Sequence, residues 1–430
     1  MIDIKLIREN PALVKENIKK KFQNDRLPLV DEVIKLDSEW RKLRYKEDTL
    51  RSERNKISEL INQAKKSHEE KRAKELIKKA KSIPEEIAQI QENRKVLEKK
   101  IRDIMYQIPN IIHNSVPIGK DGSQNVVRKV IGKPKKIKNV KSHVELGEML
   151  GVLDFDTSAE VSGKGFYYIK GDLALLNAAL INFARDYMVK QGFEYVETPL
   201  LIKKEILEGV YSNEEINVMS YKLEGEDLYM IATSEHPLIG QFINKTLNAK
   251  DLPLKQTSYS MCFRREIGSH GIDEKGIFRT HQFNKQEMIV ICEPSESYKW
   301  YDKMLKYSID LFKELGIPIR VLESCSGDLA NLKAKGCDIE AWSPRQEKYF
   351  EVTSLTNMEE AQARRLNIKI DNGKERYFAH TLNNTAIATS RALVAIMENF
   401  QQKDGSILIP KVLQKYMHGK KKISAKNKTG

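Results

Sequence analysis

A seven-residue repeat of apolar side chains constrains the fold of residues 29–104 more than any other feature. The repeat is carried by Leu29, Leu36, Leu43, Leu50, Ile57 and Ala64, and after a polar break near residues 66–70 by Leu76, Ile83, Ile90, Leu97 and Ile104. Side chains at this spacing form one stripe along a helix. The pattern predicts two long helices in an antiparallel hairpin, an arm roughly 50 to 60 Å long at 1.5 Å rise per residue.

Four residues qualify this prediction. Glu47, Arg54 and Arg94 occupy positions in the apolar seam, and Pro84 interrupts the second helix, where it predicts a kink. Polar seam residues commonly fix the register of a helix pair at some cost in stability, which is the role expected for them here. A coiled coil that dimerises remains an alternative, although a hairpin closed on itself already buries its stripe.

The net charge of +14 is concentrated at the two ends of the chain. Residues 1–110 carry +8 and residues 411–430 carry +7, whereas the remaining residues carry −1. Either a polyanionic partner of the N-terminal region or a solvated helix surface explains this excess, and charge alone does not decide between them. The exposed cations expected near the tip of the arm are Lys71, Arg72, Lys78 and Lys79.

The length of 430 residues favours at least two domains, expected at 1–110 and 111–430. The four cysteines have no Cys-x-x-Cys spacing, so buried thiols are expected rather than a disulfide framework or a zinc site. The start of the chain does not resemble a secretory signal, and no apolar run approaches the length of a membrane span. We therefore expect a cytoplasmic protein.

Residues 262–287 are typical of two strands that flank a glycine-containing loop, which begins near Gly268. Alternation predicts that Arg264 and Glu266 project from one face of the first strand, where they can bind phosphate and an adenine amine, with Phe283 available for stacking. Taken alone, an Arg-x-Glu pair also fits a solvated ion pair. The chain contains no Gly-x-Gly-x-x-Gly or P-loop motif, so side chains would have to hold the phosphates.

The rest of the chain from about residue 142 alternates helical and extended patterns without regular βαβ units. Extended segments are expected at 167–169, 194–198, 258–263, 277–292, 320–323 and 347–353. This predicts an α+β domain built on an antiparallel sheet. Residues 109–141 are interpreted as a surface connector, and the lysine-rich tail from Lys420 onward as disordered.

Five segments, in order along the chain, together resemble a known family. They are residues 1–20, Thr233-Ser234-Glu235, 262–287, Glu351 to Ser354 with Gln362 to Arg365, and 381–399. Residues 262–287 resemble motif 2 and residues 381–399 motif 3 of class II aminoacyl-tRNA synthetases, and the whole set resembles the seryl-tRNA synthetases. The resemblance implies the class II catalytic fold, with an antiparallel sheet flanked by helices and a helical arm.

The resemblance also assigns roles to individual residues. It implies that ATP is bound by Arg264, Arg265, Glu266, Arg279, Thr280, Phe283, Glu351, Val352, Thr353, Ser354 and Arg391, with Arg264 and Arg391 catalytic. It implies that serine is bound by Thr233, Ser234, Glu235, Arg264, Glu287, Asn383 and Thr385. Glu351 and Ser354 resemble the family's magnesium ligands, whose hard oxygens suit Mg²⁺.

The implied reaction joins L-serine to ATP as seryl-adenylate and then transfers the seryl group to the 3′ end of tRNA(Ser), with tRNA(Sec) an open possibility. The implied role of the arm is to bind the long variable extension of the tRNA through its shape and backbone. Residues 182–191 and 194–199 resemble motif 1, which implies a homodimer.

The sequence departs from the commonest bacterial pattern at Asn384-Thr385, Thr353, Leu355 and Ser390. Two further interpretations stay open: a ligase that loads a small amino acid onto another carrier, and a non-catalytic RNA-binding relative. The arm argues against the former. The presence of Arg264, Glu266, Glu287 and Arg391 argues against the latter.

Overall fold

The computed structural model describes residues 1–266 and 276–425, except for the side chains of residues 213 and 214. The chain divides into two compact units: residues 2–109, and residues 110–430 together with Met1. The predicted loop from Gly268 and the last residues of the lysine-rich tail lie outside the described residues.

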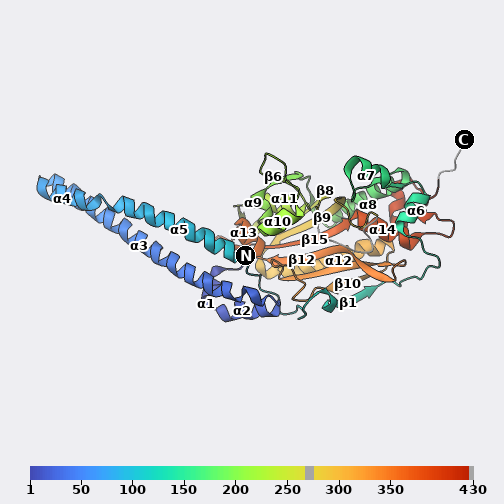
Figure 1. Ribbon diagram of the computed structural model, residues 1–430, viewed down its shortest axis with the longest axis horizontal. Helices are drawn as coiled ribbons and strands as arrows, with labels where there is room; N and C mark the ends of the chain where they lie inside the picture. Colours follow the sequence, from blue (N-terminus) through green and yellow to red (C-terminus); the bar gives the residue numbers. More distant parts are fainter. Residues whose placement is uncertain (267–275, 426–430) are drawn as a thin grey trace. The chain divides into compact units, whose positions relative to one another are not determined.

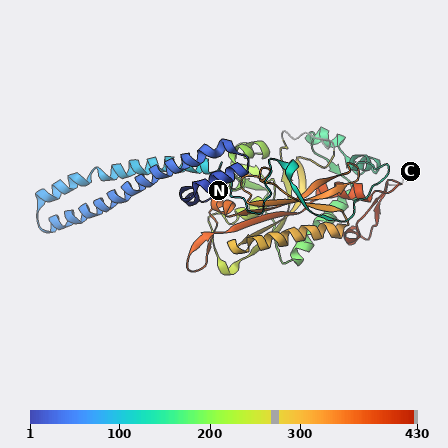
Figure 2. The same cartoon turned by 90° about the horizontal axis from the view of Figure 1, so that it is seen from below.

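The smaller unit is helical (Figure 1). Its helices are α1 (Ile4–Glu9), α2 (Pro11–Lys20), α3 (Leu27–Lys66), α4 (Glu70–Ala80) and α5 (Ile83–Met105). Helix α3 runs alongside α4 and α5 in both views (Figures 1 and 2), which confirms the predicted antiparallel arm. Pro84 lies in the first turn of α5, where a missing N–H costs nothing, so it starts a new helix rather than kinking a continuous one.

The seam of the arm combines apolar packing with one buried polar cluster. Ile57, Ile83 and Ile87 pack together. Closer to the N-terminal end of α3, the buried carboxylate of Glu47 accepts hydrogen bonds from Arg51 and Gln91 at 2.7 and 2.9 Å and from Arg94. The hydrogen bond from Gln91 contributes most to lowering the pKa of Glu47 to about 2, against the opposing effect of burial and with help from both arginines. Arg54, also predicted in the seam, is exposed instead.

The larger unit is built on one eight-stranded sheet. In spatial order its strands are β1 (Val126–Ile131), β10 (Ile319–Glu323), β11 (Lys335–Ser343), β12 (Lys348–Glu359), β15 (His380–Ala388), β9 (Gln282–Cys292), β8 (Leu254–Phe263) and β4 (Glu194–Tyr195). Every neighbouring pair is antiparallel except β4 and β8. This confirms the predicted α+β domain with an antiparallel sheet.

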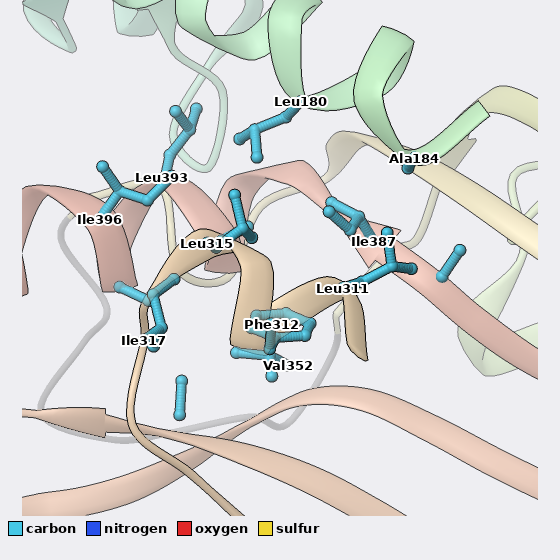
Figure 3. Packing of buried hydrophobic residues seen from close by; sticks show 14 of the residues in the cluster. Leu180, Ala184, Leu311, Phe312, Leu315, Ile317, Val352, Ile387, Leu393 and Ile396 are labelled. Atoms are coloured by element: carbon cyan, nitrogen blue, oxygen red, sulfur yellow. The ribbon is translucent and has the colours of Figure 1, made fainter. Parts of the chain in front are cut away.

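Three helices cover one face of this sheet: α8 (Gly171–Lys190), α12 (Ser297–Leu315) and α14 (Thr389–Phe400). Figure 3 shows their side chains packed with those of the sheet, among them Leu180, Ala184, Leu311, Phe312, Leu315, Val352, Ile387, Leu393 and Ile396. Met288 and Val290 of β9 belong to this core, whereas Ile289 and Ile291 pack on the opposite face. Alternation along β9 therefore separates a helix-covered face from a second face.

Shorter elements complete the larger unit. The helices are α6 (His143–Met149), α7 (Asp156–Ser162), α9 (Lys204–Leu207), α10 (Asn213–Met219), α11 (Glu235–Gly240), α13 (Ala361–Leu366) and α15 (Lys411–Gln414). The strands are β2 (Leu153–Asp154), β3 (Tyr168–Ile169), β5 (Leu201–Lys203), β6 (Leu228–Met230), β7 (Thr246–Asn248), β13 (Lys369–Asp371), β14 (Arg376–Phe378), β16 (Ile407–Leu408) and β17 (Lys422–Ile423). All four cysteines are buried and free. Among the described residues, no helix is both long and apolar enough to cross a membrane.

The structure corrects three further sequence expectations. The connector is not only a surface linker, because its residues 126–131 form β1 and pair with β10. The tail is not wholly disordered, because its residues Lys422–Ile423 form β17, which pairs with β16. Strand β8 ends at Phe263, so Arg264 and Glu266 follow the strand rather than alternate within it, and Glu266 has a left-handed φ of 46°.

Candidate active site

The face of the sheet that α8, α12 and α14 leave open gathers most of the predicted site residues. They come from the end of β8, from β9, β12 and β15, from the turn before α11, and from the start of α14, in the central part of the larger unit in Figure 1. Ser258, Glu287 and Thr385 are direct neighbours across three strands, so their side chains share one face. Long-range strand pairing therefore assembles the site.

Glu287 lies at the centre of a buried polar cluster. Its Oε2 accepts hydrogen bonds from the hydroxyls of Thr233 at 3.4 Å and Thr385 at 3.3 Å, and lies 2.5 Å from Nζ of Lys285. Among the described residues, none donates a hydrogen bond to Oε1. Glu287 is 1% exposed. One carboxylate oxygen is thus held by the protein, and the other is available to a ligand.

Glu235 provides a second buried carboxylate. Its Oε1 accepts a hydrogen bond from Nε2 of Gln362 on α13 at 3.0 Å. Burial raises the pKa of Glu235 to about 7, and the nearby charge of Glu287 adds to this rise. Two carboxylates in one buried region favour a cationic ligand, such as an ammonium group.

Arg264 forms the next part of the site. Its guanidinium lies over the ring of Phe283, 5.2 Å from the centroid, and Nε donates to the carbonyl of Ala232 at 3.4 Å. The acidic groups that act on it electrostatically include Glu266 and Glu351. Guanidinium planes bind phosphate oxygens in bidentate fashion and also stack on rings, so Arg264 with Phe283 is suited to a nucleotide.

A second arginine pairs with the carboxylate on β12. Nη1 of Arg391 lies 3.0 Å from Oε2 of Glu351 and donates to the Glu351 carbonyl at 3.0 Å. Partial burial opposes ionisation of Glu351, but the charge of Arg391 outweighs it and lowers the pKa of the carboxyl. Arg391 also lies over Phe278 at 5.1 Å, and Arg279 lies 3.6 Å from Glu266. These arginines bring positive charge to the same region.

A β-bulge explains how Glu351 and Ser354 reach the same face although they are three positions apart. The register between β11 and β12 shifts between Ile339 and Glu340, and Val352 enters the helix-covered core. Ser354 is the direct neighbour of Asp338 and hydrogen-bonds to it. Burial raises the pKa of Asp338 to about 7, and Glu351 adds to the rise.

Other predicted residues have side chains engaged in the fold. The Ser234 hydroxyl donates to the Ser258 carbonyl, and the Thr280 hydroxyl donates to the Gln282 carbonyl. Arg265 is exposed and donates to the Asn217 carbonyl. Thr353 and Asn383 are buried, and among the described residues their Oγ1 and Nδ2 atoms have no hydrogen-bond partner.

Sequence reasoning missed two residues that the structure places at the centre. Lys285 contacts Glu287, and it lies two positions before Glu287 on β9, so strand alternation was a signal that could have found it. His236 is buried next to Glu235, with its ring edge-on to Tyr211 at 5.2 Å. Burial lowers the pKa of His236 to about 3, and Lys285 and Arg264 lower it further. No spacing rule distinguishes such a histidine from a surface one.

Comparison with known families defines the class of the protein. Residues 219–400 match the tRNA synthetase class II core domain (G, H, P, S and T), and residues 1–112 match the seryl-tRNA synthetase N-terminal domain. The antiparallel sheet with its arginine-lined face is accordingly the catalytic core of a class II aminoacyl-tRNA synthetase. Within that class, the chain belongs to the seryl-tRNA synthetase family.

Similar proteins span the whole chain. It is 43% identical to the serine–tRNA ligase of Methanocella arvoryzae, covering 97% of this chain and 99% of the relative, and 44% identical to that of Pyrococcus horikoshii, covering 100% and 99%. The crystal structure of Pyrococcus horikoshii seryl-tRNA synthetase complexed with ATP has a TM-score of 0.92 and covers 99% of this chain and 100% of that one. The cytoplasmic enzyme of Naegleria fowleri in complex with AMP, at 36% identity and 99% coverage of both chains, has a TM-score of 0.87.

Proposed function

We propose that the protein activates L-serine with ATP to form seryl-adenylate and pyrophosphate, and then transfers the seryl group to the 3′ end of tRNA(Ser). The observation that carries this proposal is the convergence of Arg264, Glu287 and the Arg391–Glu351 pair on one face of the sheet. Family membership supports the reaction, and the site geometry supports the roles of the residues. A tRNA(Sec) substrate would use the same site.

The activation step requires alignment and charge neutralisation more than acid or base chemistry. The serine carboxylate attacks the α-phosphorus and pyrophosphate leaves, so negative charge gathers on the phosphate oxygens. Arg264 would bind the α-phosphate while Phe283 stacks on adenine and Glu266 accepts from the adenine amine. Arg279 and Arg391 would bind the outer phosphates or the second face of the base.

Serine would be selected beside Glu287. The free Oε1 of Glu287, together with Thr233 and Thr385, offers partners for the ammonium and the hydroxyl, and Glu235 adds negative charge nearby. A site that hydrogen-bonds a substrate hydroxyl rejects an analogue without it by about 10⁴ to 10⁵, because buried groups are left unpaired. Alanine and glycine would be rejected in this way, and threonine by its size.

Magnesium would be held by Glu351 and Ser354 together with phosphate oxygens. Carboxylate and hydroxyl oxygens suit this ion, which binds through few protein groups and keeps substrate phosphates and water as further ligands. No group of three or more His, Cys, Asp or Glu side chains suited to a metal occurs in the described part of the chain. The bound ion would neutralise phosphate charge.

We assign residues 1–110 to tRNA binding and residues 111–430 to catalysis. Lys71, Arg72, Lys78 and Lys79 are exposed on the arm, where a rigid basic rod can follow the phosphates of double-stranded RNA. Motif 1, formed by α8 and the strand after it, supports a homodimer. The reaction would serve translation in the cytoplasm.

The test is serine-dependent exchange of pyrophosphate into ATP, measured with serine, threonine, alanine and glycine. Wild-type protein should prefer serine, and Arg264→Ala should lose about 10³ in rate, as expected when a preorganised charged donor is removed. Arg376→Ala is the matched control, since Arg376 is exposed on β14 and donates to Asp371, and its loss should be much smaller. Exchange without serine preference, or equal losses in the two variants, would contradict the proposal.

A further inference from the structure

His143 is a buried histidine that the proposed chemistry does not use. It is the first residue of α6 and 1% exposed. Its position is fixed locally by a capping box, in which Ser142 and Glu145 exchange hydrogen bonds at the start of the helix. Buried ionisable side chains are costly unless they are paired, so the partners of His143 indicate its role.

The two ring nitrogens of His143 contact different parts of the larger unit. Nε2 accepts a hydrogen bond from the backbone N–H of Ile277 at 3.3 Å. Nδ1 lies 3.4 Å from Oε1 of Glu398 on α14. An N–H that donates to Nε2 requires this nitrogen to be unprotonated, so the proton is on Nδ1 and points to Glu398.

Glu398 is held in turn by the last residue of β11 and by a residue of the turn that follows. Its Oε2 accepts from the Ser343 hydroxyl at 2.5 Å, and its Oε1 accepts from Nε of Arg345 at 3.1 Å. Glu398 is fully buried. The carboxylate therefore orients the imidazole, and the imidazole presents its acceptor to the backbone at residue 277.

The chain fits tightly against this imidazole. Gly276 has a φ of 126°, and a Cβ placed there would lie 2.2 Å from Nε2 of His143. Only glycine adopts this conformation readily, and only glycine leaves room for the ring. The contact between His143 and residues 276–277 is thus built into the backbone.

The residues next to this contact belong to the nucleotide site. Phe278 lies under Arg391, and Arg279 lies beside Glu266. Arg391 is on α14, two turns before Glu398. His143 therefore connects, through one ring, the backbone that carries Phe278 and Arg279 and the helix that carries Arg391.

We infer that His143 is a positioning residue for ATP: its unprotonated Nε2 fixes the backbone at Ile277 so that Phe278, Arg279 and Arg391 meet the nucleotide in the correct geometry. The inference rests on the proposed function. A purely structural histidine would affect ATP and serine binding alike. A positioning role predicts an effect on ATP alone, because Glu287 and Thr385 are held by pairing between β9 and β15, whereas residues 277–279 precede β9.

Two substitutions of His143 distinguish the role of Nδ1 from that of Nε2. His143→Asn keeps a donor near the Nδ1 position and removes the acceptor for Ile277, whereas His143→Gln places an amide oxygen near the Nε2 position. His143→Asn should raise the KM for ATP about 10- to 100-fold, as expected for misplaced binding groups, while the KM for serine stays within about twofold. His143→Gln should recover most of the ATP affinity. His418→Asn, at an exposed position, is the matched control.

Binding of ATP alone, measured by calorimetry, gives a readout that does not depend on serine activation. A lower ATP affinity in His143→Asn than in His143→Gln, at similar melting temperatures, supports the inference. Equal ATP affinities in the two variants, or ATP and serine KM values that rise together, would overturn it. The proposed function fails separately, if wild-type protein shows no serine-dependent exchange.

Gly276→Ala provides an independent check, because its methyl group would lie 2.2 Å from Nε2 of His143 and would displace the ring. It should weaken ATP binding in the same way as His143→Asn, and the double variant should lose little more than either single one, since both disturb one contact. Additive losses in the double variant would mean that the two residues act separately, and would overturn the inference.

Discussion

The arm and the catalytic sheet each contain a buried glutamate next to a cation, and the two carboxylates differ in which of their oxygens accept hydrogen bonds. In the arm, Oε1 of Glu47 accepts from Arg51 and Gln91, and Oε2 accepts from Arg94. In the sheet, the donors to Glu287 converge on Oε2. A carboxylate satisfied on both oxygens has a structural role, whereas one satisfied on a single oxygen is prepared for a ligand.

The difference follows from how each region is assembled. The arm is a helix pair in which neighbours along the seam supply every partner, so a buried charge can be fully paired locally. The sheet gathers residues from distant parts of the chain on the face that α8, α12 and α14 leave open. Polar atoms on that face, such as Oε1 of Glu287, keep unused hydrogen-bonding capacity. Such unused capacity within a buried region is what a specific binding site requires.

The largest effect should come from Glu287→Ala. Removal of the carboxylate takes away the proposed partner of serine and leaves Lys285 without its buried counter-charge. Serine-dependent exchange should fall by about 10⁴, the range seen when a hydrogen-bonding site loses its match to the substrate.

The double variant Lys285→Leu with Glu287→Leu sharpens this test. Replacing both members of a buried pair by apolar groups can preserve the fold, so its melting temperature should exceed that of Glu287→Ala, yet its exchange activity should stay lost. Recovery of activity in the double variant would show that Glu287 is structural, like Glu47.

The arm offers the matching experiment at Arg94. Arg94→Leu leaves Glu47 buried with fewer partners and should destabilise the helix pair by about 3 kcal/mol, the lower end for a broken buried pair. Circular dichroism during thermal unfolding, with hydrogen exchange of residues 40–100, would measure this loss.

In the arm, the double variant should behave differently from the double variant in the sheet. Glu47→Leu with Arg94→Leu should recover much of the stability and retain tRNA charging, because the pair has no ligand to serve. If the double variant charged tRNA poorly while its arm remained folded, the distinction between the two glutamates would fail.

The same contrast explains which features the sequence alone could predict. The arm follows from local periodicity, so its helices and hairpin were predictable from residue spacing, whereas the end of one helix before Pro84 was expected only as a kink. The polar seam positions Glu47 and Arg94 were also visible, although their direct pairing was not. Each prediction concerned residues that are neighbours in a helix pair.

The sheet depends on pairings between distant segments, which periodicity does not reveal. Strands β1, β11 and β15 were not predicted, and the bulge that lets Glu351 and Ser354 share a face is invisible in a pattern of period two. Family resemblance supplied the site residues in order, but not Lys285 or His143, whose roles depend on contacts with other elements. Only the three-dimensional structure shows the contacts of these two residues.

A smaller effect is expected at the tip of the arm. Alanine at Lys71, Arg72, Lys78 and Lys79 removes up to four phosphate contacts, so kcat/KM for tRNA should fall by about 10- to 100-fold at moderate salt, and its salt dependence should become shallower. Exchange of pyrophosphate should not change, since the site on the sheet is intact. A loss of exchange, or unchanged charging, would contradict the division of roles.

The smallest effect concerns pH and again separates the two regions. Burial and Glu287 raise the pKa of Glu235 to about 7, so below this pH Glu235 is neutral and attracts the serine ammonium less. The kcat/KM for serine should fall as pH decreases from 8 to 6, by up to about tenfold over this range, and Glu235→Gln should flatten the profile. The pKa of Glu47 is about 2, so the buried ion pair of the arm keeps its charge in this range and should not contribute to the pH dependence. A serine profile that is flat in wild type, or that Glu235→Gln leaves unchanged, would show that Glu235 does not bind the ammonium.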